Sequence, residues 1–304
     1  MDYKKIIKSR KVRIKIMQAL SFIPDELMVK IQYRIKTGRN LDLKNPQRFT
    51  EKLQWYKLNH RDPLMAQCVD KYEVRNYIKN CGHDEILNEC YGVFDSPDEI
   101  DFSLLPNAFV LKDTLGGGGN SVIVVNDKTE IDEENIRRQM QEWVDEPTNK
   151  KHPGREWVYD GRKHRIIVEK YIDSEPEDGG LIDYKFFCFN GKSEYLYVIA
   201  DRNFGEKSGL AIYDSEYRKL DAVRVDEKPL ERVVEQPTNY KEIKTLAETI
   251  AKPFPEARVD FYDVDGKILF GEITFFDGSG YMKYDPDEFD YEMGAKFDLD
   301  KRTK

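Results

Sequence analysis

The chain has 304 residues, of which 39% are hydrophobic, 12% aromatic and 35% charged, with a formal net charge of −8. This composition predicts a folded protein of one large or two ordinary domains and excludes wholesale disorder. The charge is uneven: residues 1–40 hold 11 Lys and Arg against 3 Asp and Glu, and the other 264 residues hold 38 against 54. So acidic a body excludes nucleic acid bound by bulk electrostatics.

Several signals of other protein classes are missing from the sequence. No stretch approaches the roughly 18 apolar residues of a membrane span, and Lys11, Arg13 and Lys15 interrupt any secretory signal core. The four cysteines show no CxxC spacing, and the four histidines show no zinc-binding spacing. We therefore expect a cytoplasmic protein with reduced thiols.

The basic N-terminal region carries apolar residues at spacings that suit one face of a helix: Ile6, Ile7, Val12, Ile14, Ile16, Met17 and Leu20. A basic amphipathic helix can lie on an anionic membrane surface, here the inner face of the cell membrane. It can also pack as a cationic helix against the acidic body. Both interpretations stay open for residues 1–40.

Apolar spacing and turn residues then predict helices followed by strands. Pro46 precedes a helix in FTEKLQWYKL, with Phe49, Leu53 and Tyr56 on one face. Beyond it we expect, in order, a helix over 66–79, strands in NAFVLKD and SVIVVND from about residue 107, a helix over 132–144, a strand in RIIVEKYI and a linker over 173–181.

The second half of the chain is predicted to be mainly strand. The segment DYKFFCFNGKSEYLYVIADR indicates a hairpin that turns at Asn190-Gly191. A helix over 239–251 is expected to begin with a capping box of Asn239 and Glu242. A last hairpin, ARVDFYDVDGKILFGEITFF, closes the core, and the tail after about residue 290 is expected to be loosely held.

A glycine-rich segment, FVLKDTLGGGGN, joins two predicted strands at residues 109–120. Glycines let backbone N–H groups approach phosphate oxygens, and Lys112 before them can neutralise phosphate charge. It is not a P-loop, because no GK[ST] follows and no helix begins there. The alternative is a hairpin turn, but four glycines are more than a turn needs, so we favour a phosphate-covering flap.

The last hairpin is predicted to carry two carboxylates on one face. A three-residue loop at 264–266 would pair residue 263 with 267 and place Arg258 opposite Glu272. One face would then be apolar, with Val259, Phe261, Leu269, Ile273 and Phe275. The other would hold Arg258, Asp260, Glu272 and Thr274. Two carboxylates suit Mg²⁺, which takes one or two of them plus substrate phosphates, although a solvated face with an Arg258–Glu272 ion pair is the alternative.

Two further pairs of charged residues are possible parts of a site. A two-residue turn at Asn190-Gly191 places Lys185 and Arg202 on one face, as anion-binding groups or as exposed cations. Asp263-Val264-Asp265 is similar to the DxD of metal-dependent glycosyltransferases, but turn chemistry before Gly266 accounts for it adequately.

The order of these segments resembles the ATP-grasp superfamily: Lys112 on a strand, a glycine-rich flap, the run Glu169-Lys170-Tyr171-Ile172, then Arg258-x-Asp260 and Glu272-x-Thr274. The segments NPQRFTEKLQWYKL, VDKYEVRNYI, DYKFFCFNGK and RVDFYDVDGKILFGEITFFDGSG resemble more specifically the TupA-like ATP-grasp amidoligases. The resemblance covers about residues 44–292. It implies an α+β ATP-grasp fold, two α+β subdomains that clamp ATP after an N-terminal helical region.

The resemblance also implies a role for each matching residue. Lys71 and Lys112 would contact the nucleotide, Gly116, Gly117, Gly118, Gly119 and Asn120 would form the flap, and Glu169, Lys170, Tyr171 and Ile172 would read adenine, chiefly through backbone groups of Lys170 and Ile172. Asp260, Glu272 and Thr274 would hold Mg²⁺. Arg258, Lys185 and Arg202 would act in catalysis. Thr274 stands where ATP-grasp enzymes usually have Asn, and Asp113, Thr114, Leu115 and Gly117 differ from the usual flap of this branch.

By resemblance, the expected activity is an ATP- and Mg²⁺-dependent carboxylate–amine ligase for bacterial cell-surface polysaccharides, joining an amino acid or amine to a uronate-type sugar. A glycosyltransferase that uses Asp263 and Asp265 is one alternative, and a degenerate, non-catalytic scaffold is another. The expected regions are 1–43, 44–106, 107–173 with the flap, and 174–304 with the metal-binding hairpin. The sequence does not indicate the oligomeric state.

Overall fold

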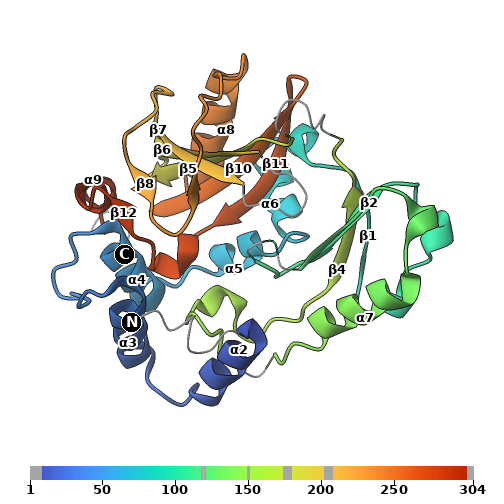
Figure 1. Cartoon of the computed structure of the whole chain (residues 1–304), viewed down its shortest axis with the longest axis horizontal. Helices are drawn as coiled ribbons and strands as arrows, with labels where there is room; N and C mark the ends of the chain where they lie inside the picture. Colours follow the sequence, from blue (N-terminus) through green and yellow to red (C-terminus); the bar gives the residue numbers. More distant parts are fainter. Residues whose placement is uncertain are drawn as a thin grey trace. The chain divides into compact units, whose positions relative to one another are not determined.

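The computed structural model describes residues 9–117, 119, 121–148, 151–173, 180–201 and 208–299 (Figure 1). The chain forms two compact units, each described separately below. The first comprises residues 1–62, 150–157 and 175–304, and the second comprises residues 63–149 and 158–174. Helices together with mainly antiparallel sheets give the α+β class that was expected.

The second unit is built on a four-stranded antiparallel sheet with the strand order β1-β4-β2-β3. Its elements are α5 (Pro63–Val69), α6 (Val74–Asn80), β1 (Cys90–Phe94), β2 (Phe109–Asp113), β3 (Val122–Val125), α7 (Glu133–Val144) and β4 (Ile166–Lys170). Ile136 and Met140 of α7 pack in one buried cluster with Phe109, Leu111 and Val168 of the sheet. Alternation along β2 and β4 therefore leaves Lys112 and Glu169 on the opposite face.

Two sequence predictions for this unit were wrong. The helix expected over 66–79 is broken into α5 and α6, because the Asp70 carboxylate accepts backbone hydrogen bonds from Tyr72 (2.9 Å) and Glu73 (2.9 Å) between them. The second is an omission, because no strand was predicted at β1. This is a short edge strand whose register shifts between Cys90 and Gly92, so it lacks the period-two pattern that predicts strands.

The first unit is built on a six-stranded sheet with the order β11-β10-β5-β6-β7-β9. Its elements are α2 (Arg10–Ala19), α3 (Asp25–Thr37), α4 (Phe49–Asn59), β5 (Asp183–Phe189), β6 (Lys192–Ala200), β7 (Gly209–Asp214), β8 (Val223–Arg224), β9 (Lys228–Pro229), α8 (Tyr240–Ala251), β10 (Glu256–Val264), β11 (Lys267–Thr274), β12 (Tyr284–Asp285) and α9 (Glu288–Lys296). Strands β12 and β8 form a separate small sheet. Short 3₁₀ turns connect several elements of both units.

Helix α8 covers one face of the six-stranded sheet. Ile243, Leu246, Ala247 and Ile250 are buried, as their helical spacing predicted, and Tyr240 packs against Phe186 of β5. The capping box expected at its start is absent. The Asn239 side chain instead donates to Asp263 (3.3 Å) and to the Gly266 carbonyl (3.3 Å), which ties the helix to the β10–β11 turn.

The opposite face of this sheet is partly covered by α4 and α9. Phe49 of α4 contacts Phe187 and Phe189 of β5 edge to face, with ring centroids 6.0 and 5.6 Å apart. Phe49, Leu53 and Tyr56 are buried on one side of α4, as predicted. The tail expected to be loose forms α9, whose Met293 is buried, because the apolar residues in it pack against α4 rather than facing solvent.

The two hairpins form with registers that differ from the predicted ones. Asn190 and Gly191 both have positive φ and make the expected two-residue turn, but the β5–β6 register shifts at Phe187/Cys188. In the last hairpin, Asp265 and Gly266 form a two-residue turn with φ of 53° and 79°, so Val264 pairs with Lys267. The predicted three-residue loop was wrong.

The β10–β11 register shifts again between Val259 and Phe261. Arg258 therefore lies opposite Thr274, not opposite Glu272 as predicted. At this register shift β11 has one residue more than β10, which changes the facing of the β11 residues before that point. Leu269 pairs with Tyr262 on the side of Asp260, not on the apolar side with Val259. The other predicted facings of this hairpin agree with the observed register and burial.

At the N-terminus, α2 and α3 follow each other as separate helices, and Ile6 and Ile7 lie outside the described residues. Tyr33 of α3 is buried and its hydroxyl lies 2.9 Å from Thr50 Oγ1 of α4. Within the described ranges, no helix combines the length and apolarity needed to cross a membrane.

Candidate functional site

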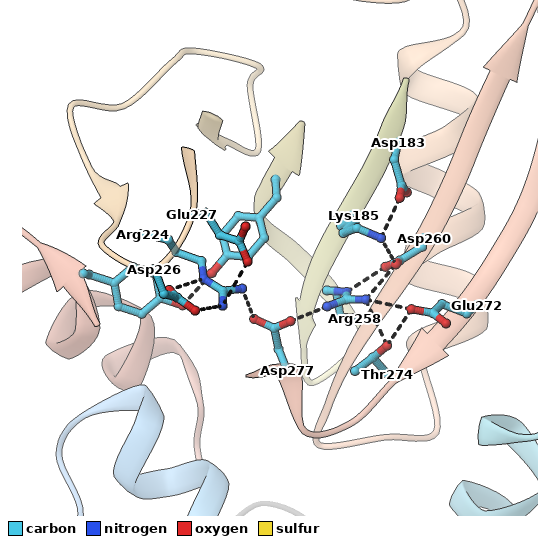
Figure 2. A network of polar contacts seen from close by, with 12 residues as sticks. Asp183, Lys185, Arg224, Asp226, Glu227, Arg258, Asp260, Glu272, Thr274 and Asp277 are labelled. Carbon is cyan, nitrogen blue, oxygen red and sulfur yellow. Dashed lines mark hydrogen bonds and ion pairs between the residues drawn. The ribbon is translucent and has the colours of Figure 1, made fainter. Parts of the chain in front are cut away.

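The six-stranded sheet carries a line of charged residues on the face opposite α8 (Figure 2). Lys185 comes from β5, Arg258 and Asp260 from β10, and Glu272 and Thr274 from β11. Lys185 lies directly opposite Asp260 across the β5–β10 ladder. Five of the predicted site residues therefore meet on one surface, although they come from three strands.

The Asp260 carboxylate is the centre of this group. Arg258 donates to it through Nε (2.8 Å) and Nη2 (2.7 Å), and Lys185 Nζ forms a short contact with the same carboxylate. Asp260 is only 1% exposed. A carboxylate so deeply buried requires cations beside it, which these two strands provide.

The Arg258 guanidinium extends from this centre towards β11. Its Nη2 donates to Glu272 Oε1 (3.0 Å) and to Thr274 Oγ1 (3.0 Å), and Thr274 in turn donates to Glu272 (3.4 Å). The threonine hydroxyl thus links the arginine to the glutamate. Glu272 is the most exposed of these acids, with a side chain 40% exposed.

Sequence reasoning missed two acids that hold the cations in place. Asp183 lies 2.7 Å from Lys185 Nζ, and Asp277 contacts Arg258 Nη1 directly after the hairpin. Both are buried. Strand alternation in DYKFF puts Asp183 and Lys185 on one face, so the first could have been found. The second begins a 3₁₀ turn after β11, and the sequence does not specify the path of that turn.

Asp277 also connects Arg258 to a second arginine. Arg224 Nη1 donates to Asp277 Oδ2 (3.3 Å), while its other nitrogens contact Asp226, at 2.8 Å for Nη2 (Figure 2). Burial of Arg224 is thereby compensated by acidic neighbours on both sides. The network is continuous from Lys185 to Asp226.

The electrostatic balance keeps Lys185 protonated. Burial alone would lower its pKa, but the charges of Asp183 and Asp260 outweigh that effect, so the pKa of Lys185 is raised above its ordinary value. The same reasoning applies to Arg258, where Asp260 and Asp277 oppose desolvation and raise the pKa. The surface therefore holds two fixed positive charges.

The oxygen donors of this face are consistent with a magnesium ion. Mg²⁺ needs only one or two carboxylates when substrate phosphates and water complete its shell. Glu272 offers a partly exposed carboxylate. Asp260 Oδ2 accepts from both Lys185 and Arg258, but Oδ1 accepts from Arg258 Nε and keeps a second lone pair. No cluster of three or more His, Cys, Asp or Glu suited to a metal occurs among the residues described. A metal here would therefore depend on ligands from a substrate.

The four-stranded sheet of the second unit carries its own charged face. Lys112 of β2 lies 2.8 Å from Glu169 Oε2 of β4, and Arg75 of α6 lies 3.4 Å from Glu169 Oε1. The side chain of Lys112 is 27% exposed, more than that of any cation in the buried group above. Lys112 and Glu169 were both predicted as site residues, and the structure joins them directly.

The glycine-rich segment is a connection between β2 and β3, with a well-packed base. Lys71 donates its backbone N–H to the Thr114 carbonyl (2.9 Å) and its Nζ to the Gly116 carbonyl (2.5 Å). A Cβ on Gly116 would lie 2.7 Å from Ser121 Cβ, whereas one on Gly117 would meet nothing within 4 Å. Close packing therefore explains why residue 116 is a glycine, but it does not explain the glycine at 117. Gly118 and Asn120 lie outside the described residues, and Gly119 has φ of 70°.

The acid beside the flap, Asp113, does not share the face of Lys112. It is buried, accepts a hydrogen bond from the Leu115 backbone (3.0 Å) and lies 2.8 Å from His164 Nδ1. Alternation along β2 turns it away from Lys112. Although Asp113 departs from the usual flap sequence, its carboxylate therefore does not lie beside Lys112.

The run from Glu169 to Ile172 leaves the sheet at the end of β4. The Lys170 N–H donates to the Glu89 carbonyl (2.9 Å), and the Lys170 carbonyl accepts from the Asn88 side chain (2.8 Å). The single N–H of Lys170 is thus engaged, which leaves Ile172 as the better candidate of the two for a backbone contact to a base. Tyr171 and Ile172 are half-buried, and Arg202 lies outside the described residues.

The possible DxD pair lies at the tip of the last hairpin. Asp265 has positive φ in the turn, and Asp263 accepts from Asn239. Turn geometry and helix attachment account for both residues.

The sequence of this chain matches a known protein family over most of its length. The profile of the TupA-like ATPgrasp family matches residues 51–298. The chain belongs to this family, within the ATP-grasp class. No curated protein sequence matches it.

Solved structures with similar folds include D-alanine–D-alanine ligase from Bacillus anthracis complexed with ATP, with 18% identity, a TM-score of 0.43 and coverage of 69% of this chain and 55% of that one. L-amino acid ligase from Bacillus licheniformis matches with 16% identity, a TM-score of 0.41 and coverage of 70% and 42%. The ATP-grasp ligase PsnB, complexed with a phosphomimetic variant of its minimal precursor, Mg and ADP, matches with 11% identity, a TM-score of 0.44 and coverage of 82% and 66%. The chain spans about half of the length of the first of these ligases.

Proposed function

We propose that this protein is an ATP- and Mg²⁺-dependent ligase that joins a carboxylate to an amine. The observation that carries the proposal is the set of fixed cations and carboxylates on the six-stranded sheet, in a chain that belongs to the TupA-like ATPgrasp family. The substrates we propose are a uronate-type sugar and an amino acid or amine, used to build a bacterial cell-surface polysaccharide.

In the first step, a carboxylate oxygen attacks the γ-phosphorus of ATP, the bond to the bridging oxygen breaks, and ADP leaves. Lys112 and the backbone of Gly116 and Gly117 would bind phosphate oxygens, and Ile172 would contact adenine. Mg²⁺, held by Asp260 and Glu272, would neutralise phosphate charge. Thr274 would orient Glu272 through the hydrogen bond already present.

In the second step, the amine nitrogen attacks the carbonyl carbon of the acyl phosphate, loses a proton and expels phosphate. Negative charge develops on the carbonyl oxygen. Arg258 and Lys185 would stabilise it, because their own acids already fix them in position and no reorganisation is needed. Removing one such donor typically costs about 10²–10³-fold in rate.

The decisive measurement is release of ADP by the purified full chain with ATP, Mg²⁺ and pairs of uronates and amino acids. Glu272→Gln should lower turnover about 10²–10³-fold, with little change in melting temperature because its side chain is partly exposed. Asp265→Asn is the matched control, since Asn tolerates the positive φ of the turn. Full turnover in Glu272→Gln would contradict the metal assignment.

The same variants separate the two other candidate functions. A glycosyltransferase that uses Asp263 and Asp265 would lose activity with Asp265→Asn and would bind a nucleotide sugar without ATP. A non-catalytic scaffold would show no ADP release with any pair of substrates, and Mg-ATP would not raise its melting temperature if nucleotide binding has also been lost. The turn geometry of Asp263 and Asp265 argues against the glycosyltransferase. The family match and the shared face of Arg258, Asp260 and Glu272 support the ligase.

A further inference from the structure

Helix α3 has a second apolar face that does not contribute to the core. Val29 and Tyr33 on one side are fully buried. Leu27, Ile31 and Ile35, spaced four residues apart, are 51%, 40% and 52% exposed. Residues at this spacing lie one above the other on a helix, so they form an exposed apolar stripe.

Basic residues flank the stripe. Lys30 and Arg34 occupy the positions three residues after Leu27 and Ile31, on the same side of the helix. Preceding α2 has the sequence RKVRIKIMQA, with four basic residues and no acid, and its Val12 and Ile16 are also exposed. Phe22, in the connection between α2 and α3, is 80% exposed. Apolar side chains with basic neighbours are typical of helices that lie in a membrane interface.

The two acids of α3, Asp25 and Glu26, do not cancel the positive charge of α2 and α3. Asp25 lies 2.8 Å from Lys151 Nζ, and Glu26 lies 2.5 Å from Lys30 Nζ. Residues 1–40 hold 11 basic and 3 acidic residues, whereas the rest of the chain is acidic. An anionic surface would therefore attract this end of the chain and repel the remainder, which favours one orientation.

We propose that α2 and α3 dock on an anionic phospholipid surface. Phe22, Leu27, Ile31 and Ile35 would enter the boundary between headgroups and acyl chains, and Lys15, Lys30 and Arg34 would contact the headgroups. A second copy of this chain is a poorer occupant, because a symmetric contact would bring two basic surfaces together. The proposal does not depend on the ligase activity.

The test measures co-sedimentation of the full chain with vesicles of phosphatidylcholine alone, or with about one third phosphatidylglycerol. The wild type should bind only the anionic vesicles, and binding should weaken as salt is raised. The triple variant L27S/I31S/I35S should lose at least about tenfold in binding. Lys11→Gln with Lys15→Gln should weaken binding and its salt dependence.

A matched control, L104S/V225S/V233S, removes three exposed apolar side chains from other elements and should bind as the wild type does. Point variants are preferable to deletion of the helices, because Val29 and Tyr33 belong to the core. Circular dichroism and melting temperature show that each variant is folded.

Failure of the wild type to bind anionic vesicles would overturn the proposal, as would equal binding by the folded L27S/I31S/I35S variant. A wild-type dimer that this variant converts to a monomer, with vesicle binding unchanged, would assign the stripe to a second copy and also overturn it.

Discussion

The two charged sheet faces of this protein differ in how their ions are compensated. On the six-stranded sheet, Lys185 and Arg258 are each held by two buried acids, and Asp260 is 1% exposed. On the four-stranded sheet, one acid, Glu169, pairs with both Lys112 and Arg75, and the lysine side chain is 27% exposed. The cations of the first face are buried among acids, whereas the lysine of the second face is partly accessible to solvent.

This difference suggests a division of tasks. A buried cation surrounded by acids cannot move towards a ligand, so it suits stabilisation of charge that develops during a reaction. A partly exposed lysine with one partner can exchange that partner for a phosphate at small cost. If this is so, removing an acid from the buried face should cost more free energy of unfolding than removing the acid of the accessible face.

Asp260→Asn should show the largest effect on stability. It leaves Lys185 and Arg258 buried with one full negative partner fewer, and loss of a buried ionic partner costs about 3 kcal/mol or more. Urea unfolding gives the free energy directly. Asp263→Asn, three residues along the same strand and only half-buried, is the control and should cost less than about 0.5 kcal/mol. Equal effects of the two variants would mean that burial of Asp260 between two cations contributes nothing to stability.

Lys57 provides a buried cation without the acidic partners of Lys185. Its Nζ donates to Gln54 Oε1 (3.1 Å) and to the carbonyls of Gly154 (3.1 Å) and Ser279 (2.8 Å). Burial lowers the pKa of Lys57 to about 7, despite an opposing charge from Glu156. The unfolded chain then binds more protons than the folded one above pH 7, so this group makes stability rise with pH until the ordinary lysine pKa is reached.

The expected slope is about 1 kcal/mol per pH unit between pH 7.5 and 9, as a difference between wild type and Lys57→Met. Urea midpoints measured across that range give it, and subtraction removes other titrating groups. Parallel curves would mean that the three oxygen acceptors keep Lys57 charged, and that neutral acceptors can replace carboxylates in this fold.

The last hairpin shows which structural features the sequence could predict. Strand alternation predicted that Arg258, Asp260, Glu272 and Thr274 share a face, and they do. It could not predict which of them pair, because the turn has two residues rather than three and β11 carries an extra residue. Local patterns fix facing over a few residues, whereas register depends on turns and bulges that many sequences allow.

Contacts between residues far apart in the sequence were harder still to predict. Lys185 lies opposite Asp260 because β5 pairs with β10. Local sequence patterns do not indicate which strand lies beside β5. Asp277 was missed for the same reason. The broken helix at Asp70 is different, since an Asp whose side chain caps the following residues is a known local signal.

Glu169→Gln should have a smaller effect than Asp260→Asn, about 1 kcal/mol. Lys112 and Arg75 lose their shared anion but keep access to water, and Arg75 retains its bond to the Asn88 carbonyl (2.7 Å). Unfolding in urea measures the cost. A loss as large as that of Asp260→Asn would show that the four-stranded face is as strongly coupled as the buried one, which the exposed fraction of Lys112 argues against.

Gly117→Ala should have the smallest effect on stability, under about 0.5 kcal/mol, because an added Cβ meets nothing within 4 Å. Gly116→Ala is the matched variant and should cost about 1–3 kcal/mol, since its Cβ would overlap Ser121. If the flap brings its backbone against phosphates, Gly117→Ala should still weaken Mg-ATP binding several-fold by calorimetry. Unchanged affinity in a fully stable Gly117→Ala protein would remove this glycine from the proposed nucleotide site and leave Lys112 and the Gly116 backbone as the groups proposed to bind phosphate.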